Sequence, residues 1–391
     1  MKIRHREGWR AVAALAMACA SATIAAKSPL NDTGVAWCVD TVAGTIGVAC
    51  AGTGQDGETG RDVTNDHHGN GPYGFDFAKV CNSGQVAGEG SCSAAAVQGP
   101  GPDDWGCTKD DHTGLVWELR TRDGGLIDWR KNYTNMGGAA ATDTSGLVAA
   151  VNAQGLCGAS DWRMPTRSEL LGKLDLGTRV RNFDDSRWFP DNAAFGGDPG
   201  SYWTSQDVVW DAGESWVIDD SLAQIYIATN TYAFASARLV REPVPHVVAP
   251  RWLVHGQQVT DAQTRLTWRR CVEGMTWDGS TCKGKPTLYT WSDALAHAQD
   301  AAAKSGLAWR VPNVKELESL LDVSVGYPSI DTTAFPGTPT KYTFQYTWTS
   351  SPFSIGGDTS AYANIADFGG GIVYIAGWAE GHVVRLVRDK D

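Results

Sequence analysis

Hydrophobic and polar positions follow the same pattern twice along the chain. Residues 161–170 read Asp-Trp-Arg-Met-Pro-Thr-Arg-Ser-Glu-Leu, and residues 308–317 read Ala-Trp-Arg-Val-Pro-Asn-Val-Lys-Glu-Leu. In each copy an apolar segment meets Thr or Asn, which accept hydrogen bonds at helix starts, and Glu follows three residues later as in a capping box. Leucines at helical spacing come next: Leu170, Leu171 and Leu174, then Leu317, Leu320 and Leu321. The pattern predicts two short helices, each with one buried face, capped by Thr166 and Asn313.

The segments that flank these helices also repeat in the same order. The matching pairs are Thr113–Trp117 with Thr264–Trp268, Phe189-Pro190 with Phe335-Pro336, Tyr202–Ser205 with Thr347–Ser350, and Arg238–Arg241 with Arg385–Arg388. We also match Trp129 with Trp291. A period of roughly 130 residues with two copies indicates tandem globular domains rather than a solenoid of short units.

Each repeat combines helical and alternating segments. The first has a weak helix at 146–153 that ends at Gly155. The second has a clearer one, with Ser292 as its cap, over 293–304 and ending at Gly306. Alternating segments predict strands at 115–119, 202–209, 215–219, 223–228 and 237–241, and a strand-like piece at 74–80. Strand, helices, long loop and several strands in this order predict an α+β fold.

The N-terminus has the composition of a secretory signal. Four basic residues precede position 11, and an apolar Ala-rich run of 11–26 follows, too short for a membrane anchor. Cys19 has a poor lipobox before it, so we favour a cleaved signal over a lipid anchor on Cys19. We divide the chain into a signal peptide (1–26), a Gly- and Asp-rich extension packed on the first domain (27–104), the first domain (105–241), a proline-containing linker (242–250) and the second domain (251–391). We expect export to the periplasm, cell surface or medium.

The cysteines agree with export. Eight remain after the signal, an even number that suits an oxidising compartment. Short spacings favour the pairs Cys38–Cys50, Cys81–Cys92 and Cys271–Cys282, and exclusion then leaves Cys107–Cys157. Sequence alone leaves other connectivities open.

The net negative charge argues against polyanionic partners. Loss of residues 1–26 removes four basic residues and one acidic residue, so the formal net charge changes from −11 to −14. Such a surface repels nucleic acid and anionic lipid at a distance. No segment after the signal is apolar enough to cross a membrane. Oligomeric state cannot be read from the sequence.

The ordered motifs resemble the Lcl C-terminal domain family. They are Thr-x-Leu-x-Trp, Asp-Trp-Arg-x-Pro-x-x-x-Glu-Leu, Phe-Pro, Tyr-Trp-Thr-Ser and Arg-Leu-Val-Arg, with a disulfide hairpin at Cys271 and Cys282. The chain departs from the family pattern at Arg265, where Gly is usual, and at Ala308, where Asp is usual. The resemblance implies two tandem C-type-lectin-like domains in an exported bacterial protein. Named family members act as surface adhesins that bind host glycans.

Tryptophans that recur at matched positions are expected in the core, so unmatched residues are the better ligand candidates. These candidates are Trp188, Trp210, Trp216, Trp378, Asp184 and Asp185. We expect the loops 176–201 and 323–346 to contact the ligand, and the first of them contains Trp188, Asp184 and Asp185. The recurring arginines are expected to pair with carboxylates or carbonyls of the protein itself.

No cofactor is expected. Calcium is possible, because Asp184 and Asp185 with Asp191, or Asp62, Asn65 and Asp66, could supply some of its six to eight oxygens. However, the triplets with which lectins of this type bind calcium are not complete in the chain.

No catalytic signature of the common hydrolase, metalloprotease or phosphate-binding kinds is present. We therefore predict a non-catalytic binding or adhesion protein that recognises a glycan or a cell-surface protein. One alternative is a carbohydrate-active hydrolase that uses acidic loop residues. Another is a structural protein of the bacterial envelope.

Overall fold

The computed structural model describes residues 30–60, 74–179, 183–190, 200–232, 235–242, 250–354 and 361–389. The extension contains β1 (Cys38–Val39), β2 (Ile46–Val48), the short 3₁₀ helix η1 (Asp56–Glu58) and β3 (Phe77–Cys81). The first repeat contains β4 (Trp105–Asp110), β5 (Val116–Glu118), α2 (Thr144–Gln154), η2 (Leu156–Gly158), α3 (Arg167–Lys173), η3 (Leu176–Thr178), β6 (Ser201–Asp207), β7 (Glu214–Asp219), β8 (Gln224–Thr229) and β9 (Val240–Arg241). The second contains β10 (Trp252–His255), β11 (Gln258–Asp261), β12 (Leu266–Arg269), β13 (Thr276–Trp277), β14 (Cys282–Lys283), α5 (Trp291–Ser305), α6 (Val314–Glu318), β15 (Tyr346–Phe353), β16 (Tyr362–Asp367), β17 (Val373–Gly377) and β18 (Val387–Asp389). The expected signal peptide and linker residues 243–249 lie outside the described residues.

The two short helices begin where their caps predict. Thr166 caps α3 and Asn313 caps α6, and in both cases the third helical residue, a Glu, completes the capping box. Each of these glutamates also pairs with the arginine of its Trp-Arg-x-Pro motif, with an N···O distance of 2.7 Å for Arg163 and 2.6 Å for Arg310. The recurring arginine therefore holds the start of each short helix in place.

The longer helices agree with the pattern except at one cap. Gly155 ends α2 and Gly306 ends α5, both with the positive φ that glycine tolerates. The predicted cap of α5 is wrong by two residues, because Thr290, not Ser292, accepts a hydrogen bond from the backbone N–H of Asp293.

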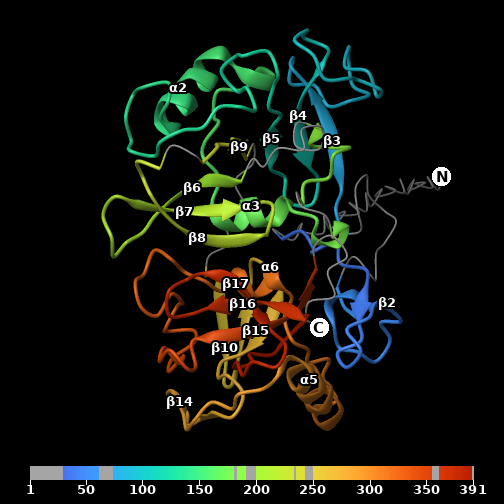
Figure 1. Ribbon diagram of the computed structural model, residues 1–391, viewed down its shortest axis with the longest axis vertical. Helices are drawn as coiled ribbons and strands as arrows, with labels where there is room; N and C mark the ends of the chain where they lie inside the picture. The colour runs from blue at the N-terminus through green and yellow to red at the C-terminus, as the bar shows by residue number, and fades with distance from the viewer. Residues whose placement is uncertain are drawn as a thin grey trace, which may run out of the picture.

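One six-stranded antiparallel sheet runs through both repeats, in the order β6-β7-β8-β17-β16-β15 (Figure 1). The repeats meet at the edge strands β8 and β17, where Ile225 pairs with Val373. These two residues occupy equivalent places, because Ile225 faces Ile218 on β7 and Val373 faces Ala366 on β16. The repeats are thus related by an approximate two-fold axis through this pair of strands.

A smaller four-stranded sheet completes each repeat. The orders are β3-β4-β5-β9 in the first repeat and β10-β11-β12-β18 in the second. β3 comes from the extension and takes the place that β10 takes in the second repeat. The extension therefore supplies a strand that the first repeat needs for symmetry with the second.

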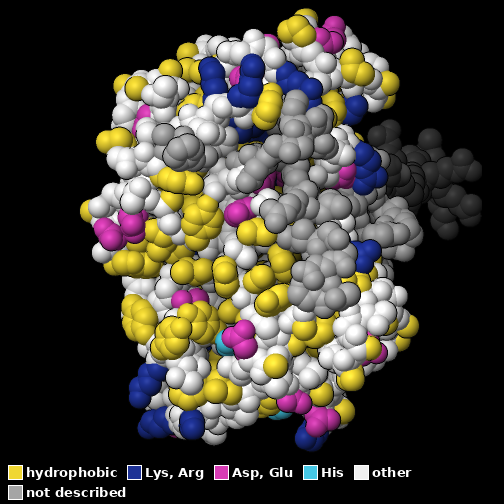
Figure 2. All heavy atoms as spheres, viewed as in Figure 1, with side chains coloured by type: hydrophobic (Ala, Val, Ile, Leu, Met, Phe, Trp, Pro, Cys, Tyr) yellow, Lys and Arg dark blue, Asp and Glu magenta, His cyan; other side chains and the backbone are white. Residues whose placement is uncertain are grey.

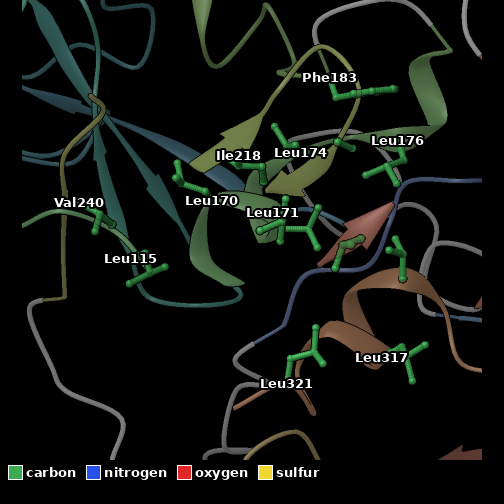
Figure 3. Close-up of a cluster of buried hydrophobic side chains, with 14 of the residues drawn as sticks. Leu115, Leu170, Leu171, Leu174, Leu176, Phe183, Ile218, Val240, Leu317 and Leu321 are labelled. Atoms are coloured by element: carbon green, nitrogen blue, oxygen red, sulfur yellow. The ribbon is translucent and has the colours of Figure 1, made fainter. Parts of the chain in front are cut away.

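The main hydrophobic core belongs to both repeats. It includes Leu170 and Leu171 of α3 and Leu317 of α6, two helices that pack against each other beneath the large sheet (Figure 3). Two smaller cores lie on the other face of the sheet, one under α5 and one under α2. Neither repeat encloses the main core by itself.

The recurring tryptophans are buried, with one mismatch. Trp117, Trp268, Trp162, Trp309, Trp203, Trp348 and Trp291 are each less than 5% exposed. The match of Trp129 with Trp291 is wrong. Tyr133 has the place of Tyr289, because the carbonyl of each tyrosine accepts from a sheet indole, Trp203 and Trp348 respectively. Trp129 precedes Tyr133 whereas Trp291 follows Tyr289, so the two tryptophans are not equivalent. Trp129 is only half-buried.

Four disulfides cross-link the chain with the expected pairing: Cys38–Cys50, Cys81–Cys92, Cys107–Cys157 and Cys271–Cys282. The third joins β4 to η2 across 50 residues.

The extension contacts both repeats. Residues 74–104 lie against the first repeat, which is where we expected the whole extension to pack, and β3 pairs with β4. Residues 31–58 also contact the second repeat, where Val39 packs with α5 and Gln299 donates to the carbonyl of Gly52 (Figure 1).

Candidate ligand-binding site

Two of the candidate tryptophans lie together, at the end of the large sheet. Trp210 is 46% exposed and its ring meets that of Trp216 edge-on at 6.0 Å. Trp216 itself is fully buried, and the guanidinium of Arg167 stacks on it at 4.5 Å. Of this pair, only Trp210 presents a ring to solvent.

The other two candidate tryptophans make internal contacts. Trp188 is half-buried against Phe77 and Trp105, and its carbonyl accepts from the hydroxyl of Thr108. Trp378 stacks on Trp291 with ring centroids 5.3 Å apart. Neither joins the pair at the end of the sheet.

Both candidate carboxylates pair with cations of the first repeat. Asp184 is buried and pairs with Lys173 and, at 3.6 Å, with Arg238. Asp185 pairs with Arg187 at 2.7 Å. These ion pairs stabilise the first repeat. A ligand role for the two carboxylates stays a prediction without structural support.

A pocket of about 440 Å³ lies between the repeats. Its walls are the start of α3, the segment after α6, and the β4–β5 and β11–β12 turns. Its lining residues include Thr166, Ser168, Glu169, Gln206, Glu242, Arg251, Leu321, Asp322, Val323 and Ser324, with Leu30 and Asn31 of the extension. We call this pocket the open groove.

The approximate two-fold axis relates the open groove to a second groove that the extension fills. In this filled groove, residues 32–37 lie across α6 and the segment after α3. The side-chain amide of Asn313 donates to Asp32 at 2.9 Å, and the ammonium of Lys315 donates to the carbonyl of Asp32 at 2.6 Å. The backbone N–H of Leu176 donates to the carbonyl of Thr33 at 2.8 Å.

Further contacts close the filled groove. Trp37 donates from its indole to the carbonyl of Gly177 at 3.2 Å, and Ser351 donates to Asp56 at 2.6 Å. The ammonium of Lys315 also donates to the carbonyls of Gly172 and Leu174, at 2.9 and 2.7 Å. Extension and both repeats are thereby joined around one buried lysine.

Every wall position of the filled groove has a counterpart in the open one. The pairs are Asn313 with Thr166, Lys315 with Ser168, Ser351 with Gln206, Asp175 with Asp322, Leu176 with Val323, and Gly177 with Ser324. Local hydrogen bonds support the match. The backbone N–H that follows each helix cap donates to the equivalent side chain in both repeats. Arg167 donates to Gln206 at 2.9 Å, and Val314 donates to Ser351 at 3.0 Å.

The turn after each short helix is also the same. Gly177 donates its N–H to Asp175 at 2.9 Å, and Ser324 donates to Asp322 at 3.1 Å. The grooves therefore have matching backbones, and they differ in their occupant and in a few side chains.

The open groove has a backbone donor with no acceptor. The N–H of Leu176 is bonded to the extension, whereas its counterpart at Val323 donates to no residue within the described ranges. Val323 is only 3% exposed as a residue and lines the open groove, so an acceptor for this N–H has to come from water or a ligand in the groove. Gln206 adds a second donor, because its Oε1 accepts from Arg167 and its amide group is left for other partners.

The charges of the two grooves differ. Burial raises the pKa of Asp56 to about 8 in the filled groove, with a further contribution from the charge of Asp32, and burial lowers the pKa of Lys315 to about 7. The open groove has Ser168 in place of that lysine. Its Arg251 pairs with Asp261 at 2.8 Å, and acids at 169, 242 and 322 line it.

Sequence reasoning missed both grooves. The residues that make them come from the extension, from helix starts and from turns, and no local pattern connects them. Lys315 gave no signal either, because three of the five residues of α6 are charged.

Exposed apolar side chains also gather along one flank of the molecule, at the level where the repeats meet (Figure 2). Trp210, Val209 and Tyr374 are each about half exposed. No three acidic, imidazole or thiol side chains converge on a possible metal position among the residues that the structure describes. Asp191 and residues 62–66, named above as possible calcium ligands, lie outside that part.

None of the described helices is both long and apolar enough to span a bilayer. The four disulfides suit an oxidising compartment.

Comparison with known proteins identifies the repeats. The model of the Lcl C-terminal domain matches residues 106–241 and again residues 257–388. No curated protein and no solved structure matches the chain, so the C-type-lectin-like fold stays a prediction. With more than half of its length matched, the chain belongs to the Lcl C-terminal domain family and carries two copies of that domain.

Proposed function

We propose that this is an exported, non-catalytic binding protein that recognises a glycan or a cell-surface protein at the open groove. The observation that carries the proposal is the pocket between the repeats, which no described residue fills. Its counterpart holds a polar segment of the same chain through hydrogen bonds, which supports binding of a polar ligand at the open groove. A pocket with a few placed polar groups and an apolar floor is typical of a binding site.

Several features support binding rather than hydrolysis. The acidic loop residues expected to act in a hydrolase, Asp184 and Asp185, are paired with cations of the protein. Glu169, which lines the groove, completes the cap of α3 and pairs with Arg163. A carboxylate with these partners stabilises the start of the helix, which supports a structural role over a catalytic one.

The proposal is tested with the mature protein, residues 27–391, and two tyrosine variants. Ser168 lines the groove as the second residue of α3, and Ser292 is the exposed second residue of α5. We expect binding on a glycan array or in a pull-down with surface proteins, lost in Ser168→Tyr and kept in Ser292→Tyr. Turnover of a polysaccharide would favour the hydrolase instead, and co-purification with cell wall without any ligand would favour a structural role.

A further inference from the structure

The occupant of the filled groove indicates what the open groove accepts. Residues 32–37 lie there outside any helix or strand, and the chain turns at Gly34, which has φ of +80°. Main-chain groups make part of the contact, because the Thr33 carbonyl accepts from the Leu176 N–H. A groove that recognises a main chain accepts many side-chain sequences, as in other modes of peptide recognition.

We infer that the open groove binds a short polypeptide segment of a partner protein, with a carbonyl of that segment bonded to the N–H of Val323. This inference rests on the proposed function and names the class of ligand. The N–H of Val323 has no acceptor within the described residues, and a peptide carbonyl at the place equivalent to Thr33 supplies one.

The side chain at Ser324 sets the path of the ligand. A Cβ placed on Gly177 would come within 1.9 Å of the Gly34 carbonyl in the filled groove. Ser324 has that Cβ, so a bound segment cannot continue along the path of Gly34 and must end or turn outward after the carbonyl that Val323 binds. The open groove is therefore shorter than the filled one.

The charges restrict the side chains of the ligand. In the filled groove the carboxylate of Asp32 lies near Lys315, which has no cationic counterpart at Ser168. Glu169, Glu242 and Asp322 line the open groove instead. The partner segment is consequently neutral or basic in this stretch, with hydrogen-bond acceptors for the amide of Gln206.

A displayed library of random 12-residue peptides tests the inference on the mature protein. Peptides selected by the wild type should contain few acidic residues. Their Kd should weaken by at least about tenfold in Ser168→Tyr and in Gln206→Glu, and stay unchanged in Ser292→Tyr. Gln206→Glu keeps the acceptor for the Arg167 N–H and replaces the amide donor by a negative charge. Its Kd is therefore compared on selected peptides that contain no basic residue.

A gain of binding provides the second arm. Ser168→Lys with Ser324→Gly copies Lys315 and Gly177 into the open groove. The peptide of residues 30–37 should then bind at least about tenfold more tightly than it binds the wild type.

The outcomes separate this inference from the proposed function. Glycan binding that Ser168→Tyr abolishes, with no peptide selected, would overturn the peptide ligand and leave the binding function standing. Selected peptides that are insensitive to both groove variants would also overturn it. Binding of neither glycans nor proteins nor peptides would remove the proposed function as well.

Discussion

At the scale of single residues, the molecule depends on a few buried polar groups between the repeats. Asp56 accepts hydrogen bonds from Thr33 and Ser351 through one carboxyl oxygen. Its other oxygen is buried and has no partner among the described residues. A protonated carboxyl suits this environment better than a carboxylate, because burial penalises the charged form.

The variant Asp56→Asn is predicted to change how stability depends on pH. Burial raises the pKa of Asp56 from 3.8 to about 8, so its contribution is complete below about pH 4 and is lost as pH rises from there to about 8. Asparagine resembles the protonated acid and does not titrate. Thermal melting should give similar midpoints for both proteins at about pH 4 and a higher midpoint for the variant at about pH 9. An equal difference at both pH values would contradict the assignment.

The buried pair Arg167–Glu318 is the second residue-scale test. The two side chains are 1% exposed, meet at 2.9 Å and join the repeats. The equivalent positions in the opposite repeats are Val314 and Leu171, which pack in the same core. The symmetric contact is therefore an ion pair on one side and a hydrophobic contact on the other.

Replacement by these counterparts should be strongly non-additive. Arg167→Val or Glu318→Leu alone leaves one buried charge unpaired and should cost about 3–5 kcal/mol of unfolding free energy. The double variant removes both charges and should recover most of that loss. Denaturant unfolding of the four proteins measures the coupling, and additive losses would show that the two groups do not interact.

At the scale of elements, local patterns predicted most of the secondary structure. Thr166 and Asn313 fixed the starts of α3 and α6, because a cap and its glutamate lie within one helical turn. Alternation within 215–219 predicted β7 to within a residue. Such signals are local, so the sequence contains them in full.

The missing part of the prediction depends on distant partners. Alternation predicted β8 as a strand, but not that its Ile225 pairs with Val373 of the other repeat. Residues 31–33, Asn-Asp-Thr, have the composition of a solvent-exposed loop. They are buried because Asn313 and Lys315, more than 280 residues away, bond to them. Neither groove could be predicted from the sequence, because the residues that form each groove are far apart along the chain.

The fit of the extension in the filled groove can be tested with one glycine. Gly34 has φ of +80°, and a Cβ there would meet a carboxyl oxygen of Asp175 at 2.1 Å. Gly47 has φ of +81° and has nothing within 4 Å of such a Cβ. Both Gly→Ala variants bear the cost of a left-handed backbone, about 1–2 kcal/mol, and only Gly34→Ala must also displace Asp175.

We therefore expect Gly34→Ala to lower the unfolding free energy by at least about 1 kcal/mol more than Gly47→Ala. Urea unfolding of both variants measures the difference. Equal losses would mean that the extension does not lie in the groove as described.

At the scale of the whole molecule, the two repeats act as one unit. They share a sheet through β8 and β17 and a core through α3 and α6, and the extension bonds to both (Figures 1 and 3). Gene duplication alone would have allowed two independent domains on a linker. The shared core makes the grooves possible, because each groove has walls from both repeats.

The same arrangement explains why the grooves differ. One extension serves two symmetric sites, so only one can be filled by residues 32–37. The second remains as the pocket of about 440 Å³. The repeated residues build the frame, and the positions that differ between the repeats, Ser168 and Ser324 among them, determine what the open groove can bind.

Calorimetry of the mature protein tests the central claim most directly, that both repeats and the extension form one cooperative structure with one groove left open. The account predicts a single thermal transition whose calorimetric enthalpy equals its van't Hoff enthalpy. Two separate transitions, each with the enthalpy expected for about 130 residues, would show that the repeats fold independently and would contradict it.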